Sequence, residues 1–179
     1  MKRILGIGFL LGLGMGCTNS VQQITALSAN SEQPDHTGDS VSLSYLDTAG
    51  LRVTLFAAKM RVFQFRAKEP RTELDSGVHV TFYTLEGNPQ AELFAHKAIR
   101  FPSGKKTRAQ GQVLLVNKRG EQLETEELSW DEASGQIFTE APVKITRKEE
   151  VLFGNGLTGN SDFSKYELKN ITGRVKLNL

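Results

Sequence analysis

The sequence predicts an all-β protein, with a short N-terminal leader before one domain of stacked antiparallel hairpins. From Val41 onward, apolar and polar residues alternate in short runs. Turn residues interrupt these runs about every 8 to 12 positions, and no segment keeps a helical period over about ten residues. Because such hairpins leave an apolar face exposed, we expect them to close into a β-sandwich or jelly roll whose two inner faces meet.

The leader is typical of a bacterial lipoprotein signal peptide. Lys2 and Arg3 precede an apolar stretch, which ends in small residues before Cys17. At about 1.5 Å per residue, the stretch from Ile4 to Gly16 spans roughly 20 Å, too short for a hydrocarbon core of about 30 Å. We therefore expect a signal peptide over 1–16 and a lipid anchor on Cys17. Such signals usually carry Leu where this chain has Gly14, so cleavage or retention stays open.

Residues 17–40 are polar and follow no period, which predicts a flexible tether before a domain over 41–179. The chain has 22 basic and 20 acidic residues, and without Lys2 and Arg3 the two numbers are equal. A neutral domain lacks the positive field that nucleic-acid binding needs. Cys17 is the only cysteine, so an acylated Cys17 leaves no thiol for a disulfide, a metal site or catalysis.

The expected strands pair around turns that contain Gly, Asn or Pro. The alternation places them at 41–45 with 53–57, 78–82 with 93–95 and 113–115 with 123–125, followed by 128–130, 137–139 and 143–145. A turn is expected at Ala141-Pro142 between the last two. The return strands 51–63, 90–101 and 121–130 also form a weak repeat, in which Leu55, Leu93 and Leu123 correspond and Met60 matches Leu128.

The second half of the chain resembles the LptC family, the periplasmic component of the lipopolysaccharide export bridge. The landmarks are GQVLLVN at 111–117, GEQLETEELSWD at 120–131, PVKI at 142–145, GNGL at 154–157 and the segment from Asp162 to Arg174. The resemblance is strong over 111–177 and looser from 41 to 110. Many members have a membrane-spanning helix, so the lipoprotein leader is a departure.

The resemblance implies an open, twisted β-jelly roll that takes lipopolysaccharide from an inner-membrane ABC transporter and passes it to the next bridge protein. Acyl chains would lie inside, and no enzymatic activity or cofactor is expected. The implied location is the periplasmic face of the inner membrane. Sorting to the outer membrane stays open, since Thr18 rather than Asp follows the cysteine.

The candidate lipid-binding residues are the apolar side of each alternation. Each methylene moved from water into an apolar interior gains about 0.8 kcal/mol, so several chains could be held without any chemistry. The same residues would also form the core of any β-sandwich. The set is Leu43, Val53, Leu55, Val80, Phe82, Val113, Leu115, Trp130, Ile137, Val143 and Ile145.

Strand edges are the candidate partner surfaces, because an open jelly roll leaves backbone groups that another protein's strand can pair. By resemblance, one edge would dock on the transporter. The other, at Arg174, Val175, Lys176 and Leu177, would dock on the next bridge protein. The alternative is that this last strand is an ordinary interior one.

Three weaker patterns remain. Five basic residues around a Gly/Pro-containing loop could meet lipid phosphates or simply be solvated: Lys97, Arg100, Lys105, Lys106 and Arg108. The glycines of 154–159 fit G-x-G-x-x-G, but without a following helix we expect turns rather than a nucleotide site. His36, His79 and His96 are too dispersed for a local metal motif.

The competing function is a generic lipoprotein binding module with a closed core.

Overall fold

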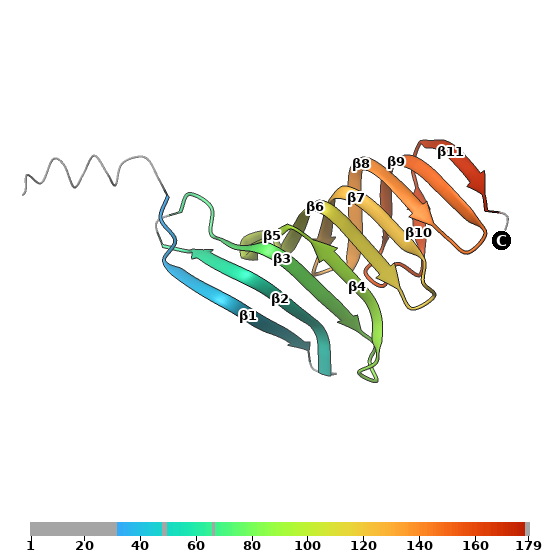
Figure 1. The fold of residues 1–179 in the computed structure, drawn as a ribbon. Coiled ribbons are helices and arrows are strands. Elements are labelled where there is room, and N and C mark those ends of the chain that lie inside the picture. Colours follow the sequence, from blue (N-terminus) through green and yellow to red (C-terminus); the bar gives the residue numbers. More distant parts are fainter. Residues whose placement is uncertain (1–31, 48–49, 66, 178–179) are drawn as a thin grey trace, which may run out of the picture. The chain divides into compact units, whose positions relative to one another are not determined.

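The computed structural model describes residues 32–47, 50–65 and 67–177. The expected signal peptide 1–16, Cys17 and most of the expected tether lie outside the described residues. The described part consists of strands and one short 3-10 turn, η1 at Pro102–Gly104 (Figure 1). The strands are β1 His36–Asp47, β2 Gly50–Phe63, β3 Arg71–Tyr83, β4 Pro89–Ala95, β5 Lys97–Phe101, β6 Lys106–Asn117, β7 Gln122–Asp131, β8 Gln136–Thr146, β9 Glu150–Asn160, β10 Tyr166–Leu168 and β11 Ile171–Lys176.

All eleven strands of the described part belong to one antiparallel sheet, in the order β1-β2-β3-β4-β6-β7-β8-β9-β10. Two positions in this strand order are each occupied by two short strands. β4 and β5 both lie between β3 and β6, and β10 and β11 both pair with β9. Figure 1 shows the strands following one another in chain order from β1 to β11. The all-β prediction is confirmed, and the hairpins are stacked side by side as expected.

The strands are interrupted along one line across the sheet, which we call the crease. Register shifts or breaks fall at neighbouring positions from strand to strand. Several of these positions have a positive φ, among them Ser76 at 63° and Gly156 at 88°. Bulges of this kind bend a strand and increase its twist. The crease comprises Ser40, Ala58, Ser76–Gly77, His96, Gly111–Gln112, Glu126, Glu140–Ala141, Gly156 and Lys169–Asn170.

The crease divides the sheet into two halves whose apolar faces form one hydrophobic core. Half-sheet A contains β4 and β11, with residues 41–46, 52–57, 78–83, 113–117, 122–125, 143–146 and 150–155 of the longer strands. Half-sheet B contains β5 and β10, with residues 36–39, 59–63, 71–75, 106–110, 127–131, 136–139 and 157–160. We call the apolar space between the halves the seam.

Each half-sheet presents an aligned row of inward side chains to the seam. The predicted alternation is confirmed, and the predicted repeat follows the register, since Leu55, Leu93 and Leu123 lie at one level and Met60 and Leu128 at another. The row of half-sheet A is Leu43, Leu55, Val80, Leu93, Leu115, Leu123, Ile145 and Leu152. The row of half-sheet B is Met60, Leu74, Ala98, Ala109 and Leu128.

Strand β1 begins at His36, inside the segment predicted to be a tether. Its first half pairs with β2, from His36 opposite Val62 to Asp39 opposite Lys59. Most side chains of 36–40 are exposed, so backbone pairing rather than apolar burial holds this segment. Apolar alternation therefore could not predict the first half of this strand.

Two expected turns are wrong, and both lie where strands meet the crease. Ala141-Pro142 is a bulge inside the continuous strand β8, not a turn. The glycines of 154–159 lie inside β9 rather than in turns. A Cβ on Gly154 would lie 2.7 Å from the backbone oxygen of Lys169, and one on Gly159 would lie 2.9 Å from that of Lys165. The glycines allow the 165–169 segment to cross close to β9.

Candidate functional site

A cavity of about 250 Å³ lies in the seam between the β1–β4 part of half-sheet A and the β5–β8 part of half-sheet B. Its walls are largely apolar. Eight of the eleven predicted residues line it: Leu43, Val53, Leu55, Val80, Phe82, Leu115, Trp130 and Ile137. Five further residues line it and were not predicted from the sequence: Tyr45, Leu93, Ala98, Ala109 and Leu128.

The cavity exists because half-sheet B carries small side chains opposite large ones. Ala98 and Ala109 are buried neighbours on β5 and β6, and they face the Val80 and Leu93 level of half-sheet A. A methyl group in place of a branched side chain leaves space that nothing else fills. An engineered apolar cavity of about 150 Å³ is known to stay dry and to bind small hydrocarbons. A space of this size and lining therefore suits an apolar ligand segment.

The remaining predicted residues, Val113, Val143 and Ile145, do not line this cavity. All three are buried, and Ile145 is fully covered. They lie toward the C-terminal side of the seam or beside the crease, where Leu157 and Phe163 are also fully buried and fill the interior. In this structure the three residues are packed core.

The seam is open at its β1 end. β1 pairs only with β2 among the described strands, so no neighbour covers its inward side chains from outside. Leu43 and Tyr45 line the cavity, yet 43% and 49% of their surfaces are exposed. The cavity is thus accessible from solvent beside the first strand.

An ion pair between the half-exposed Arg100 and the buried Glu132 borders the cavity on half-sheet B. Arg100 Nε and Nη2 donate to the two carboxylate oxygens of Glu132, each at 2.7 Å, and the Thr107 hydroxyl donates to the same carboxylate at 3.0 Å. The Glu132 side chain is only 8% exposed. Its hydrogen bonds raise the pKa of Arg100 above the ordinary value, against the opposing effect of burial. The polar groups and the apolar walls give the cavity an amphipathic character.

This ion pair changes the interpretation of the predicted basic loop. Arg100 is committed to Glu132, and Arg108 lies 3.6 Å from Glu127. Lys97 lies on β5, Lys105 ends η1 and Lys106 begins β6. The five basic residues therefore extend from β5 through the η1 turn into β6, and two of them, Arg100 and Arg108, face carboxylates.

Trp130 lies at the border between the cavity and a more polar recess. It lines both spaces, and the recess is also formed by Tyr83, Thr84, Gln90 and Ser161. The edge of one ring meets the face of the other between Trp130 and Phe82, with centroids 5.6 Å apart. Trp130 Nε1 is buried and has no hydrogen-bond partner among the described residues.

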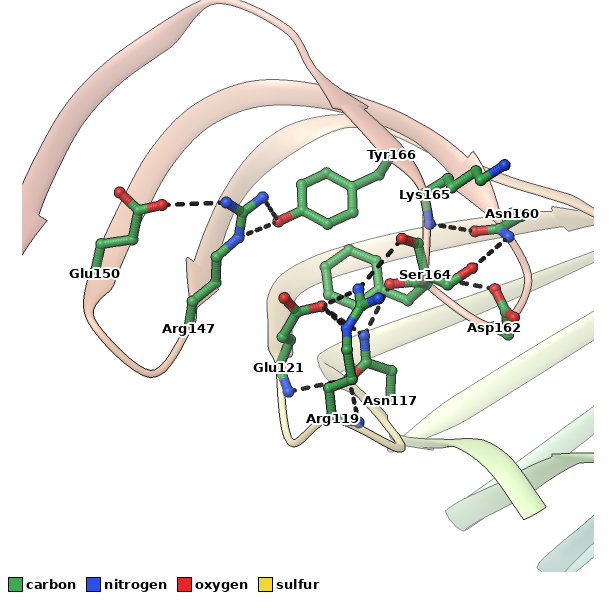
Figure 2. A network of polar contacts seen from close by, with 11 residues as sticks. Asn117, Arg119, Glu121, Arg147, Glu150, Asn160, Asp162, Ser164, Lys165 and Tyr166 are labelled. Atoms are coloured by element: carbon green, nitrogen blue, oxygen red, sulfur yellow. Dashed lines mark hydrogen bonds and ion pairs between the residues drawn. The ribbon is translucent and has the colours of Figure 1, made fainter. Parts of the chain in front are cut away.

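The C-terminal end of the seam is closed by the turn between β9 and β10. Phe163 from this turn is fully buried and stacks on Tyr166 at 4.5 Å. Figure 2 shows the polar network around it, in which Asn117 and Arg119 donate to the backbone oxygens of Phe163 and Ser164 from the opposite half-sheet, and both also donate to Glu121.

Glu121 and Tyr166 of this network have shifted pKa values. Burial by itself would raise the pKa of Glu121, but hydrogen bonds from Arg119 and Asn117 outweigh it and hold the pKa below its ordinary value. Burial raises the pKa of Tyr166, although Arg147 donates to its hydroxyl oxygen at 2.6 Å and acts in the opposite direction. The charged carboxylate and the neutral phenol are therefore the favoured forms of the folded state.

The predicted partner edge lies at the end of the sheet. Arg174, Val175 and Lys176 belong to β11 and pair with Leu152, Val151 and Glu150 of β9, while Leu177 follows the strand. Within the part of the chain that the structure describes, β11 pairs with β9 alone. Its other edge carries the backbone groups that strand pairing needs.

The same described residues include no group of three or more His, Cys, Asp or Glu side chains arranged to hold a metal ion. Among them there is also no helix long and apolar enough to cross a membrane.

A single creased sheet around an apolar cavity defines a β-jelly-roll protein of the kind suited to shielding apolar ligands. Comparison with known families gives the particular family. The profile described as "Lipopolysaccharide-assembly, LptC-related" matches residues 5–176, and the chain belongs to this LptC family. No curated protein matches the chain. The family consists of periplasmic, inner-membrane-associated components of the lipopolysaccharide transport bridge, which are not known as enzymes.

Proposed function

We propose that this protein accepts lipopolysaccharide from an inner-membrane ABC transporter, shields acyl chains in the seam and passes the lipid to the next bridge protein. The observation that carries the proposal is the apolar cavity, open beside β1 and continuous with the inward row of half-sheet A. The fully packed C-terminal part of the seam would have to open as the lipid advances.

The size of the cavity limits what it holds at one time. Its volume is about 250 Å³. This volume suits part of one acyl chain rather than a whole multi-acylated lipid. Each buried methylene would contribute about 0.8 kcal/mol, so binding is cumulative along the row and no single position is a deep trap.

The two ends of the sheet are the proposed docking sites. The free edge of β1 would receive a strand of the transporter, and the free edge of β11 a strand of the next bridge protein. This would align the seam with those of its neighbours. A lipid anchor on Cys17 would hold the domain at the periplasmic face of the inner membrane.

The alternative, a generic lipoprotein binding module, predicts a closed and dry core throughout. An accessible cavity lined by small residues opposite large ones favours the lipid-carrying function. The lining set proposed to contact acyl chains is the eight predicted residues in the cavity together with Leu93, Ala98 and Ala109.

Photo-crosslinking in living cells tests the proposal. A crosslinker at Leu55 or Phe82 inside the cavity should give lipopolysaccharide adducts, whereas one at the exposed, outward Glu92 of β4 should not. Ala109→Leu fills the cavity and should suppress the adducts at Phe82, while Ala133→Leu makes the same change on an exposed turn and should leave them intact. A folded, exported protein that gives no lipid adduct, or equal adducts at all three positions, contradicts the proposal.

A further inference from the structure

The indole N–H of Trp130 is a buried donor without a partner among the described residues. Buried polar groups in proteins are nearly always hydrogen-bonded, because an unpaired donor loses its hydration and gains nothing in return. Glu132, the carboxylate that lines the cavity together with Trp130, is already engaged by Arg100 and Thr107. A donor of this kind, beside a cavity, indicates an acceptor that arrives with a ligand.

The position of this donor is well defined. Trp130 pairs with Thr107 of β6 and Ile137 of β8 in the sheet, so its backbone is fixed on both sides. The ring meets Phe82 of the opposite half-sheet nearly at right angles, at 89°. Strand pairing and ring packing thus hold the indole across the seam.

The Trp130 side chain also lies at a chemical boundary. On one side of Trp130 is the apolar cavity with Val80, Leu93 and Leu115. On the other side is the recess lined by Thr84, Gln90 and other polar groups. An acylated lipid has the same order of groups: an apolar chain, then an ester or amide carbonyl, then a polar head.

We propose that Trp130 Nε1–H donates a hydrogen bond to the carbonyl oxygen that links an acyl chain to its head group. This hydrogen bond would set the depth to which a chain enters the cavity. It would also distinguish acyl chains from alkyl ether chains of equal length, which lack the carbonyl. The inference rests on the proposed lipid-carrying function and adds a residue that determines ligand specificity.

A comparison of two lipids on the full chain tests it without any mutation. The probes are 1-dodecanoyl-lysophosphatidylcholine and its 1-O-dodecyl ether analogue, titrated by calorimetry in a steroid detergent that has no acyl chain. We expect the ester to bind about five- to tenfold more tightly, as one neutral hydrogen bond allows. Trp130→Phe keeps an aromatic ring but removes the N–H, so the ratio of the ester affinity to the ether affinity should fall to about one, whatever the change in contact area does to both affinities.

The indole signal provides an independent readout. The chain has one tryptophan, so a ¹⁵N–¹H spectrum contains one indole resonance. Its proton should move downfield with the ester and not with the ether. Equal affinities together with an unmoved indole resonance would overturn the proposed hydrogen bond. A resonance that moves equally with both lipids would overturn it too, because the acceptor would then be a water rather than the ester carbonyl. Failure of both lipids to bind the folded chain would instead count against the proposed function itself.

Discussion

Asn117 Nδ2 donates a hydrogen bond to the backbone oxygen of Phe163 at 2.9 Å, across 46 residues of sequence. The same amide nitrogen donates to Glu121 Oε2, and Asn117 Oδ1 accepts from the backbone N–H groups of Arg119 and Glu121. One buried side chain therefore ties the β6–β7 turn of half-sheet A to the β9–β10 turn of half-sheet B. This link closes the C-terminal end of the seam.

Asn117→Ala should destabilise the protein by about 1–3 kcal/mol, because the carbonyl of Phe163 and two backbone N–H groups lose a partner in a buried setting. Urea denaturation followed by circular dichroism measures the change. Asn88→Ala alters an exposed turn residue and serves as the control, with little expected effect. Equal stabilities of the two variants would show that water replaces the amide.

Phe163→Ala should cost about 3–5 kcal/mol, as expected for a fully buried aromatic side chain. Phe163→Leu, which keeps more apolar volume, should cost less. Removal of the ring should also open the C-terminal end of the seam, so a crosslinker at Ile145 should gain lipid adducts in Phe163→Ala relative to wild type. A fully stable Phe163→Ala variant without such adducts would contradict the role of Phe163 as a plug.

Stability should fall at acidic pH partly through Glu121. Its pKa in the folded state is below the ordinary value of about 4.5, so its contribution is present above that value and is lost as the pH falls through the folded-state pKa. Thermal unfolding between pH 7 and pH 3 should show a smaller decline of Tm for Glu121→Gln than for wild type. Glu140→Gln, at a carboxylate whose side chain is 79% exposed, is the control and should follow wild type.

Gly154→Ala should destabilise the fold, whereas Gly173→Ala should be tolerated. Neither glycine has a positive φ, so the comparison isolates steric contact. A Cβ on Gly154 would lie 2.7 Å from the Lys169 backbone oxygen, while one on Gly173 would come no closer than 3.5 Å to Phe153. Differential scanning calorimetry of the two variants makes the test. Equal Tm values would mean that the 165–169 segment moves aside without cost.

Breaking the Arg100–Glu132 pair should be asymmetric. Arg100→Met leaves a largely buried carboxylate that keeps the hydrogen bond from the Thr107 hydroxyl, whereas Glu132→Gln leaves a guanidinium that is already 44% exposed. Removing one partner is most costly when the remaining charge is buried. We expect Arg100→Met to lower the free energy of unfolding more than Glu132→Gln, measured in guanidinium chloride. The reverse order would show that solvent reaches Glu132 freely.

The sequence predicted the strands and the inward faces because apolar alternation reports burial directly. Leu55, Leu93 and Leu123 were matched by spacing alone, and the register places them in one row. The crease gave no such signal, since residues as different as Ser76, Gln112 and Glu126 occupy it. The first half of β1 was missed because it buries almost nothing.

The cavity was only half predictable. Large apolar residues such as Val80 and Phe82 mark the wall of half-sheet A, but the space arises from Ala98 and Ala109, and a small residue in a strand does not reveal what it faces. The Arg100–Glu132 pair joins residues 32 positions apart, and no local pattern relates them. Arg100 was therefore predicted as part of a basic loop, and its carboxylate partner was not anticipated.

Because of the crease, the width and the length of the interior depend on different features of the chain. The width of the interior depends on how far each strand extends on either side of its bend, whereas the length depends only on how many hairpins are placed side by side. Adjacent strands are about 4.8 Å apart, so one more hairpin would lengthen the passage by roughly 10 Å without changing its cross-section. A chain built in this way can evolve to span a different distance by duplicating a unit, with no redesign of the wall.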